Sequence, residues 1–135
     1  MRDLYASSPN KNLAYTVIRP GGLSDKPSVG SRKVHLSQGD VYSSEVSRED
    51  VALVTVAAVL DKRTDFTTFE LNQVEGLGKA QGDLPDLDAQ LVHAGAASFE
   101  RLFDGLLTDD EMKKRYGSLI NDFRGDRIEP VTKLM

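Results

Sequence analysis

The chain has 135 residues, of which 39% are hydrophobic and 28% charged, proportions that are typical of one ordinary folded domain. Its formal net charge is −4 and its lysines and arginines are scattered, which argues against nucleic acid or an acidic membrane as its main partner. It has no cysteine, so a disulfide framework, a thiol nucleophile and a cysteine-based metal site are excluded. No apolar run approaches the roughly 20 residues that a membrane-spanning helix needs.

The first part of the chain predicts a strand that leads into a long loop. Residues 2–8 predict the end of a helix, and the residues that follow strongly favour a strand at 14–19. A loop is expected from Gly21 to Gly30. Residues 32–36 then predict a short strand at the edge of a sheet, which ends at the turn residues 38–40.

The middle of the chain predicts a helix followed by a second long strand. Ser47 and the acidic Asp50, three residues later, resemble a capping box with aspartate in the place of the usual glutamate or glutamine. They predict a helix at about 48–61 that is apolar nearly all round and therefore buried on more than one side. A strand is expected at 67–72. The strand–helix–strand order predicts a parallel pair of strands joined by a right-handed crossover.

The character of the sequence changes after residue 75, where we expect the first domain, residues 1–75, to end. Glycines and a proline predict a linker at 76–85. A helical extension is expected at 86–123, with one helix over about 86–106 and a second that begins at the capping box of Thr108 and Glu111. Residues 124–135 read as a polar tail.

Four residues directly after the first strand are the candidate cofactor-binding residues: Pro20, Gly21, Gly22 and Leu23. Open α/β sheets place their ligands at the carboxyl ends of parallel strands. Glycine allows a ligand to come close to the backbone and leaves peptide N–H groups within reach of an anion. The alternative interpretation is that Gly21 and Gly22 only turn the chain at the end of the strand.

Two ordered motifs carry a family resemblance: YTVIRPGGL at 15–23 and VSREDVA at 46–52. Together with the following strand they resemble the carboxyl-terminal part of atypical short-chain dehydrogenase/reductase-like NAD(P)-binding proteins, in the NmrA/Tic62-like branch. The resemblance covers about residues 1–75. It implies an α/β fold with a partial Rossmann-like parallel sheet, in which residues 20–23 border the nicotinamide and pyrophosphate of a dinucleotide.

The parts of that family's domain that hold the cofactor are not found before the first strand. A complete domain begins with a strand, a glycine-rich turn and a helix, and only fourteen residues precede Tyr15. Tyr5 has proline at position 9 where a Tyr-x-x-x-Lys pair would need lysine. We therefore assign no catalytic residue and expect no cofactor in this chain alone, with NADP expected if the complete fold is present.

Other candidate motifs favour ordinary structural roles. The glycines of 76–82 imitate a dinucleotide fingerprint, but Pro85 opposes the helix that this fingerprint requires. His35 and His93 lie far apart in sequence, and each is expected to be packed or solvated rather than a ligand or base. The acidic group of Asp83, Asp86 and Asp88 lacks the glycine and terminal glutamate of a calcium loop. No metal site is predicted.

Two functions from different classes remain open at this point. The first is a non-catalytic subunit or interaction module of a larger assembly, whose partners are other protein subunits or the missing amino-terminal half of the fold. The second is a fragment of an NAD(P)-dependent oxidoreductase or redox-sensing protein that lacks its cofactor-binding half. The resemblance implies a chloroplast location and a photosynthetic or thylakoid assembly, because similar family members include plastid proteins.

Overall fold

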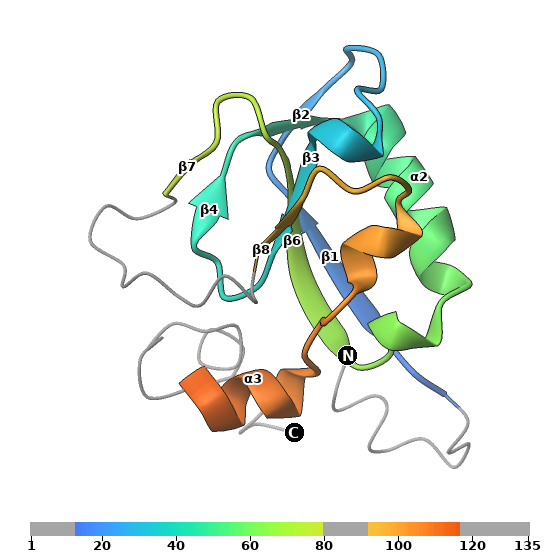
Figure 1. Cartoon of the computed structure of the whole chain (residues 1–135), viewed down its shortest axis with the longest axis vertical. Helices are drawn as coiled ribbons and strands as arrows, with labels where there is room; N and C mark the ends of the chain where they lie inside the picture. Colours follow the sequence, from blue (N-terminus) through green and yellow to red (C-terminus); the bar gives the residue numbers. More distant parts are fainter. Residues whose placement is uncertain (1–12, 80–91, 117–135) are drawn as a thin grey trace, which may run out of the picture.

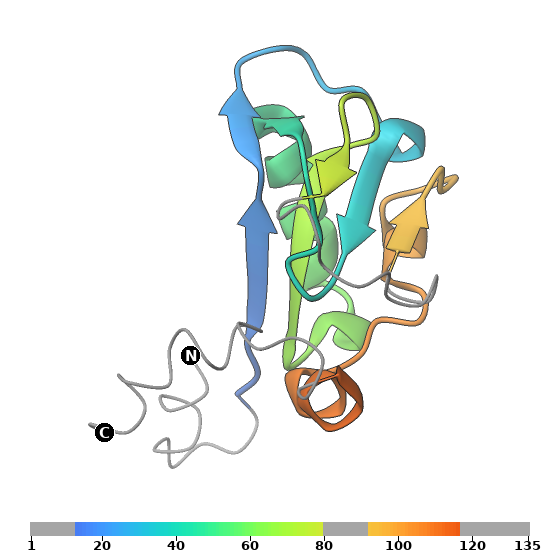
Figure 2. The same ribbon diagram turned by 90° about the vertical axis from the view of Figure 1, so that its left-hand side faces the viewer.

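The computed structural model describes residues 13–79 and 92–116 (Figure 1). The expectations for residues 2–8, 80–91 and 117–135 lie outside the described residues. The α/β fold class is confirmed. A four-stranded sheet with the order β1-β6-β3-β8 forms the centre, and α2 lies against one of its faces (Figure 2). In the described ranges, no helix has both the length and the apolar character needed to span a bilayer.

The predicted parallel pair is confirmed. Strand β1 (Thr16–Pro20) lies beside β6 (Thr67–Gln73), with Ile18 opposite Phe69 and Arg19 opposite Glu70. Helix α2 (Arg48–Val59) connects the two strands and agrees closely with the predicted helix. Figure 2 shows β1 at the edge of the sheet.

Strand β3 (Val34–Ser37) corrects the expectation of an edge strand. It lies inside the sheet and pairs antiparallel with β6 on one side and with β8 (Val92–Ala94) on the other. All four of its residues are buried. The short apolar run indicated a strand, but its place in the sheet depends on segments almost 40 residues further along the chain in one case and almost 60 in the other.

The expectation of a helix over 86–106 is wrong for the described residues from 92 onward. Residues 92–94 form β8, Gly95 follows with a φ of 71°, and η4 is a single short 3-10 helix at Glu100–Phe103. Leu102 and Phe103 of η4 are fully buried in the core. The apolar residues belong to separate short elements, and their spacing resembles the stripe of a continuous helix.

Two small pairs of strands flank the central sheet. Strand β2 (Gly22–Ser24) lies within the predicted loop and pairs parallel with β5 (Glu45–Ser47). Strand β4 (Tyr42–Ser43) pairs antiparallel with β7 (Gly78–Lys79), which lies within the predicted linker. Two further 3-10 turns, η1 (Ser31–Lys33) and η2 (Lys62–Thr64), precede β3 and β6.

Both predicted helix starts are present, and the second of them is a complete capping box. The Ser47 hydroxyl accepts a hydrogen bond from the Asp50 N–H at 3.0 Å at the start of α2. Helix α3 (Asp109–Tyr116) begins after Thr108, whose hydroxyl accepts from the Glu111 N–H while the Glu111 carboxylate accepts from the Thr108 N–H. These contacts satisfy N–H groups that the first turn of a helix leaves without partners.

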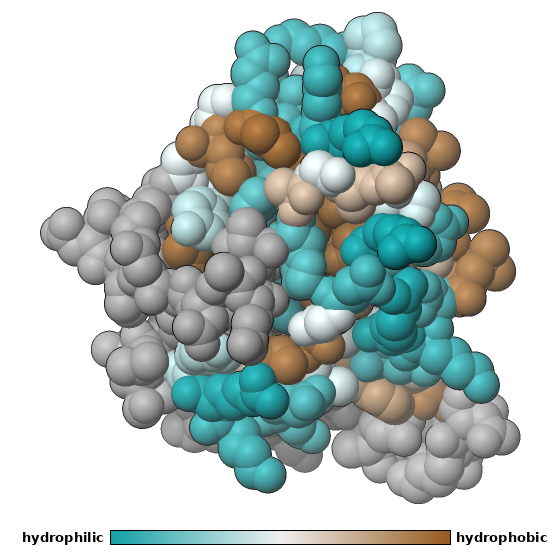
Figure 3. Space-filling model, in the orientation of Figure 1, coloured by the Kyte–Doolittle hydropathy of each residue, from teal (hydrophilic) through white to brown (hydrophobic). Residues whose placement is uncertain are grey.

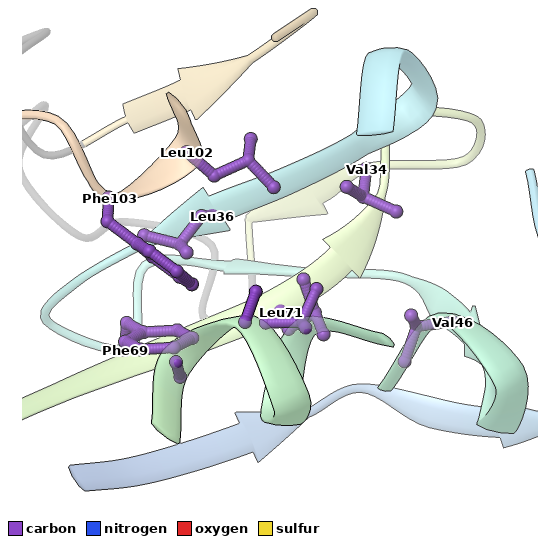
Figure 4. Packing of buried hydrophobic residues seen from close by; sticks show 10 residues of the cluster. Val34, Leu36, Val46, Phe69, Leu71, Leu102 and Phe103 are labelled. Atoms are coloured by element: carbon purple, nitrogen blue, oxygen red, sulfur yellow. The ribbon is translucent and has the colours of Figure 1, made fainter. Parts of the chain in front are cut away.

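The hydrophobic core lies between α2, η4 and one face of the sheet (Figure 4). Phe69 and Leu71 project from β6 into this layer, and the rings of Phe69 and Phe103 lie 5.9 Å apart. The buried cluster consists of Val34, Leu36, Val46, Val54, Ala57, Ala58, Phe69, Leu71, Leu102 and Phe103.

The expectation that α2 is buried on more than one side is wrong for the described part of the chain. Val54, Ala57 and Ala58 face the core, whereas the apolar side chains on the other side of the helix are exposed. These exposed residues, called the α2 outer face below, are Leu53, Val56, Val59 and Leu60. Val59 and Leu60 are 79% and 82% exposed. Figure 3 shows apolar surface at the right-hand edge, over α2.

Candidate functional site

The predicted site, Pro20–Leu23, lies where β1 leaves the central sheet and enters β2. The Gly21 N–H donates to the Leu71 carbonyl at 3.0 Å, and the Gly22 N–H donates to the Ser44 carbonyl at 3.1 Å. Both peptide N–H groups that we expected near an anion are therefore used within the protein. An anion bound in this region would have to be held by other groups.

Gly21 is required by packing within the protein. A Cβ atom at this position would lie 1.9 Å from the Ser44 carbonyl oxygen and 2.2 Å from the Asn72 Oδ1 atom. At Gly22 the nearest atom to such a Cβ is the Glu45 Cγ, 3.9 Å away, which is ordinary contact. The close approach that the Gly-Gly pair predicted is thus real, but at Gly21 it is an approach to neighbouring segments of the same chain.

A small polar cavity of about 60 Å³ lies between the carboxyl-terminal halves of β1 and β6. It is too small for a whole dinucleotide, since typical ligand pockets enclose roughly 300–1,000 Å³. Of the four predicted residues, Pro20 and Gly21 line it, while Gly22 and Leu23 do not. Its lining residues are Arg19, Pro20, Gly21, Asp40, Tyr42, Ser43, Glu70 and Asn72.

Glu70 is the main ionisable group of this cavity. Its side chain is only 4% exposed, and its Oε1 atom accepts a hydrogen bond from the Asp40 N–H at 2.6 Å. Burial raises the pKa of Glu70 to about 7, although the nearby Arg19 charge acts to lower that pKa. The cavity therefore contains a carboxyl group that can gain or lose a proton near neutral pH.

Glu70 and Asn72 were not among the predicted site residues, although the sequence contains a signal for them. Along β6, the apolar side chains of Phe69 and Leu71 alternate with the polar ones of Glu70 and Asn72. Alternate residues of a strand face opposite sides of the sheet. The polar pair therefore lies opposite the core. Asn72 accepts from the Ser44 N–H at 2.9 Å there.

His35 lies on the same polar face, opposite Asn72 in the sheet register. It is 3% exposed, and its ring meets the Tyr42 ring edge-on at 5.3 Å. Burial, and secondarily the charge of His93, lower the pKa of His35 to about 4. His35 is thus a packed, neutral histidine near pH 7, in agreement with the interpretation of the sequence.

Replacing Glu70 with glutamine is expected to change how stability depends on pH. The carboxyl group binds its proton more tightly in the folded chain, with a pKa of about 7, than at its ordinary value of 4.5. Its contribution to stability is therefore fully present below pH 4.5 and is lost as pH rises to 7. As pH rises from 4.5 to 8, the Glu70→Gln variant should therefore gain roughly 3 kcal/mol of unfolding free energy relative to the original chain.

Urea unfolding at a series of pH values measures this difference. The original chain alone would not show it, because the lowered pKa of His35 makes stability fall as pH drops from 6.5 to 4. That effect opposes the Glu70 contribution and cancels in the comparison. A difference that stays constant across the whole pH range would show that Glu70 ionises normally in the folded chain.

Asp50 joins the site loop to the start of α2. It is fully buried, and its carboxylate accepts hydrogen bonds from the Ser28 hydroxyl at 2.5 Å, the Val29 N–H at 2.9 Å and the Ser47 hydroxyl at 2.8 Å. The capping box predicted the helix start, but it did not predict this attachment of residues 28–29. The second sequence motif thus holds in place the loop that follows the first.

Comparison with known proteins adds independent information on this region. Residues 3–62 match the family model described as NAD(P)H-binding. The chain is 34% identical over 77 residues to "Uncharacterized sugar epimerase YhfK" of Bacillus subtilis, covering 57% of this chain and 31% of that protein. It is 37% identical over 59 residues to "Uncharacterized protein At2g34460, chloroplastic" of Arabidopsis thaliana, covering 44% of this chain and 21% of that protein.

The chain therefore spans less than a third of each of these two relatives. Over residues 3–62 the chain is similar to NAD(P)H-binding domains. The matched segment contains β1, the Pro20–Leu23 loop and α2. The parallel pairing of β1 and β6, with α2 on one face of the sheet, agrees with a partial Rossmann-like fold.

Proposed function

We propose that this chain is a non-catalytic interaction module, built on the carboxyl-terminal part of an NAD(P)-binding, reductase-like fold. Its partners would be other protein subunits or a polypeptide that supplies the amino-terminal half of that fold. The observation that carries the proposal is the α2 outer face, four exposed apolar residues on a helix whose opposite side is buried.

The α2 outer face has the arrangement of a helix that packs on two sides. Leu53, Val56 and Leu60 are spaced three and four residues apart, so they share one side of α2. Val59 extends the same surface. Single exposed apolar residues are common on proteins, but a contiguous group on one helix face is typical of a protein–protein contact.

Strand β1 offers a second surface for a partner. In the sheet order of residues 13–79 and 92–116, β1 is an edge strand that pairs only with β6, in parallel. Parallel sheets are usually covered on both faces and continue on both sides. A partner that added a strand beside β1 would bring its own helices. One such partner could therefore cover both the free edge of β1 and the α2 outer face.

Replacing Val56 and Leu60 together with lysine is expected to abolish partner capture without unfolding the chain. Both side chains point away from the core, so the unfolding free energy should change by less than about 0.5 kcal/mol. Buried at an interface, two lysines would remove apolar area and add uncompensated charge. The measurement is affinity purification of the tagged chain from its native source, with quantitative mass spectrometry.

The control is Thr55→Lys, which adds one charge at another exposed position of α2. We expect the original chain and Thr55→Lys to recover the same proteins, and the double variant to recover at least about tenfold less. Equal recovery by all three chains, or purification of the original chain as a monomer, would contradict the proposal.

A second function is supported by the family match rather than by the α2 outer face. The chain would then be part of an NAD(P)-dependent oxidoreductase or redox-sensing protein, with Pro20–Leu23 bordering bound NADP. Thermal unfolding with NADP tests this directly, since a ligand at about 100 times its dissociation constant adds about 2.7 kcal/mol of stability. A saturable stabilisation of the chain alone would favour this second function, and no change would favour the interaction module.

The branch of the family and the location in the cell are also proposals. We assign the chain to the NmrA/Tic62-like branch on the motifs at 15–23 and 46–52. The Arabidopsis relative is named chloroplastic, which supports a plastid assembly as the setting, whereas the Bacillus subtilis relative belongs to a bacterium. Immunodetection of the chain in isolated plastids, with and without their thylakoid fraction, would test the location.

A further inference from the structure

The middle of α2 presents a surface that carries no charge. Residues 51–60 contain no charged side chain, and Thr55 is the only polar residue among them. The Thr55 hydroxyl donates to the Val51 carbonyl at 2.7 Å, so its hydrogen atom already has an acceptor within the helix. Water can therefore be removed from the α2 outer face without leaving a polar side chain of this segment unpaired.

The spacing of the α2 outer face is that of a helix packed against another helix. Leu53, Val56 and Leu60 follow one another at intervals of three and four residues, which is the spacing of core positions in paired helices. Figure 1 shows α2 along one side of the molecule, where Figure 3 shows apolar surface. A partner helix can lie along this side, at the separation of roughly 8–10 Å that is typical of packed helix axes.

The two ends of this apolar surface carry opposite charges. Glu49, in the first turn of α2, is exposed, and the charge of its neighbour Arg48 is offset by an ion pair with Asp25 at 2.7 Å. Beyond the other end, Lys62 is exposed and forms no ion pair within residues 13–79 and 92–116, whereas Arg63 is already paired with acidic neighbours. The surface is thus acidic where α2 begins, uncharged in the middle and basic just after α2 ends.

This distribution of charge makes the surface complementary to itself when two copies of α2 run in opposite directions. Glu49 lies seven residues before Val56, and Lys62 lies six residues after it. If two helices cross about an axis close to Val56, Glu49 of each copy lies at the level of Lys62 of the other. A parallel arrangement would bring like charges together and align the two helix dipoles unfavourably.

We propose that the α2 outer face binds a second copy of this chain, with the two α2 helices antiparallel about a two-fold axis near Val56. Leu53 of one copy packs against Leu60 of the other, and every contact is made twice, as in the commonest class of homodimer. Such a dimer rests on the proposed interaction role and specifies the partner of this surface. Four apolar side chains cover less than the about 800 Å² per partner of a standard interface, so we expect a weak dimer with a dissociation constant of roughly 10–100 µM.

The first test is the mass of the purified 135-residue chain in solution, measured by sedimentation equilibrium. Chain concentrations from about 1 µM to about 1 mM bracket the expected dissociation constant, so the mass should rise from that of a monomer to twice that value. The double variant Val56→Lys, Leu60→Lys should remain a monomer at the highest concentration, because it places four lysines in the contact. The control Thr55→Lys, on another side of α2, should dimerise like the original chain.

The second test decides the orientation of the two helices. The chain has no cysteine, so Leu53→Cys and Leu60→Cys each introduce a single thiol. The two variants are mixed in equal amounts and oxidised with glutathione disulfide. A disulfide needs Cα atoms within about 7 Å, so antiparallel helices should give the mixed disulfide in at least about tenfold excess over each homodisulfide, against about twofold for random pairing. The control Glu100→Cys, at an exposed position of η4, should pair with either variant only at random.

Three results would each overturn the second copy as the occupant of the α2 outer face: a monomer at every concentration, a dimer that persists in the double lysine variant, or no excess of the mixed disulfide over random pairing. The interaction role would survive these results if purification from the native source still recovers other proteins with the original chain and loses them with the double variant. That role fails separately, by equal recovery with both chains. A dimer that the two lysines abolish, together with an excess of the mixed disulfide, would establish the antiparallel pair.

Discussion

Replacing Gly21 with alanine is expected to lower the free energy of unfolding by about 3 kcal/mol, at the upper end of the usual cost of overpacking. The added Cβ would lie 1.9 Å from the Ser44 carbonyl oxygen and 2.2 Å from the Asn72 Oδ1 atom. Neither neighbour can move freely. The Ser44 carbonyl accepts from the Gly22 N–H, and Asn72 accepts from the Ser44 N–H, so relief of the clash would break one of these hydrogen bonds.

The matched control is Gly22→Ala, at the next position along the chain. There the nearest atom to the added Cβ lies 3.9 Å away, so the change should cost less than about 1 kcal/mol. Urea unfolding of the three chains gives both values. Equal stability of the two variants would show that the separation of β1, Ser44 and Asn72 is wider in solution, and it would remove the packing explanation for Gly21.

Replacing Asp50 with alanine is expected to lower the free energy of unfolding by a similar amount, about 3 kcal/mol. The carboxylate accepts from the Ser28 hydroxyl, the Val29 N–H and the Ser47 hydroxyl in a fully buried position. Alanine leaves these buried or half-buried donors without their acceptor. The loop at 28–29 should loosen first, which amide hydrogen exchange at Val29 would detect.

Glu49→Ala is the control for Asp50→Ala, since Glu49 is also an acidic residue in the first turn of α2. Glu49 is exposed, and the hydrogen bond that its carboxylate accepts from the Ser28 N–H at 3.2 Å can be replaced by water. Its loss should cost less than about 1 kcal/mol. Fast exchange at Val29 in Asp50→Ala, with slow exchange in Glu49→Ala, would establish that Asp50 holds the loop. Equal exchange rates would contradict this role.

The parts of the fold that the sequence predicted well depend on residues that are close together along the chain. The helix starts at Ser47 and Thr108 involve contacts over three residues, and both are present. β1 and β6 are composed of residues with strong strand preference, and the helix between them requires the pair to be parallel. Local preference therefore sufficed for β1, α2 and β6.

The parts that were predicted wrongly depend on contacts between distant segments. β3 has antiparallel partners at 70–73 and 92–94, and the sequence of β3 itself contains no signal for either. The apolar residues between 92 and 103 belong to a strand and a 3-10 helix, and their spacing resembled that of a single helix. For α2, composition indicated an apolar surface, but it could not separate the buried side from the exposed side.

At the candidate site, too, some features follow from the local sequence and others from contacts between distant segments. The sequence by itself determined that the first strand is interrupted at Pro20 and Gly21, because proline cannot donate to a strand ladder and glycine weakens it. The tertiary structure alone decided what Gly21 approaches, since Ser44 and Asn72 come from segments more than 20 residues away. It also decided the state of Glu70, because a carboxyl pKa depends on burial and on neighbouring charges, and these exist only once β6 lies between β1 and β3.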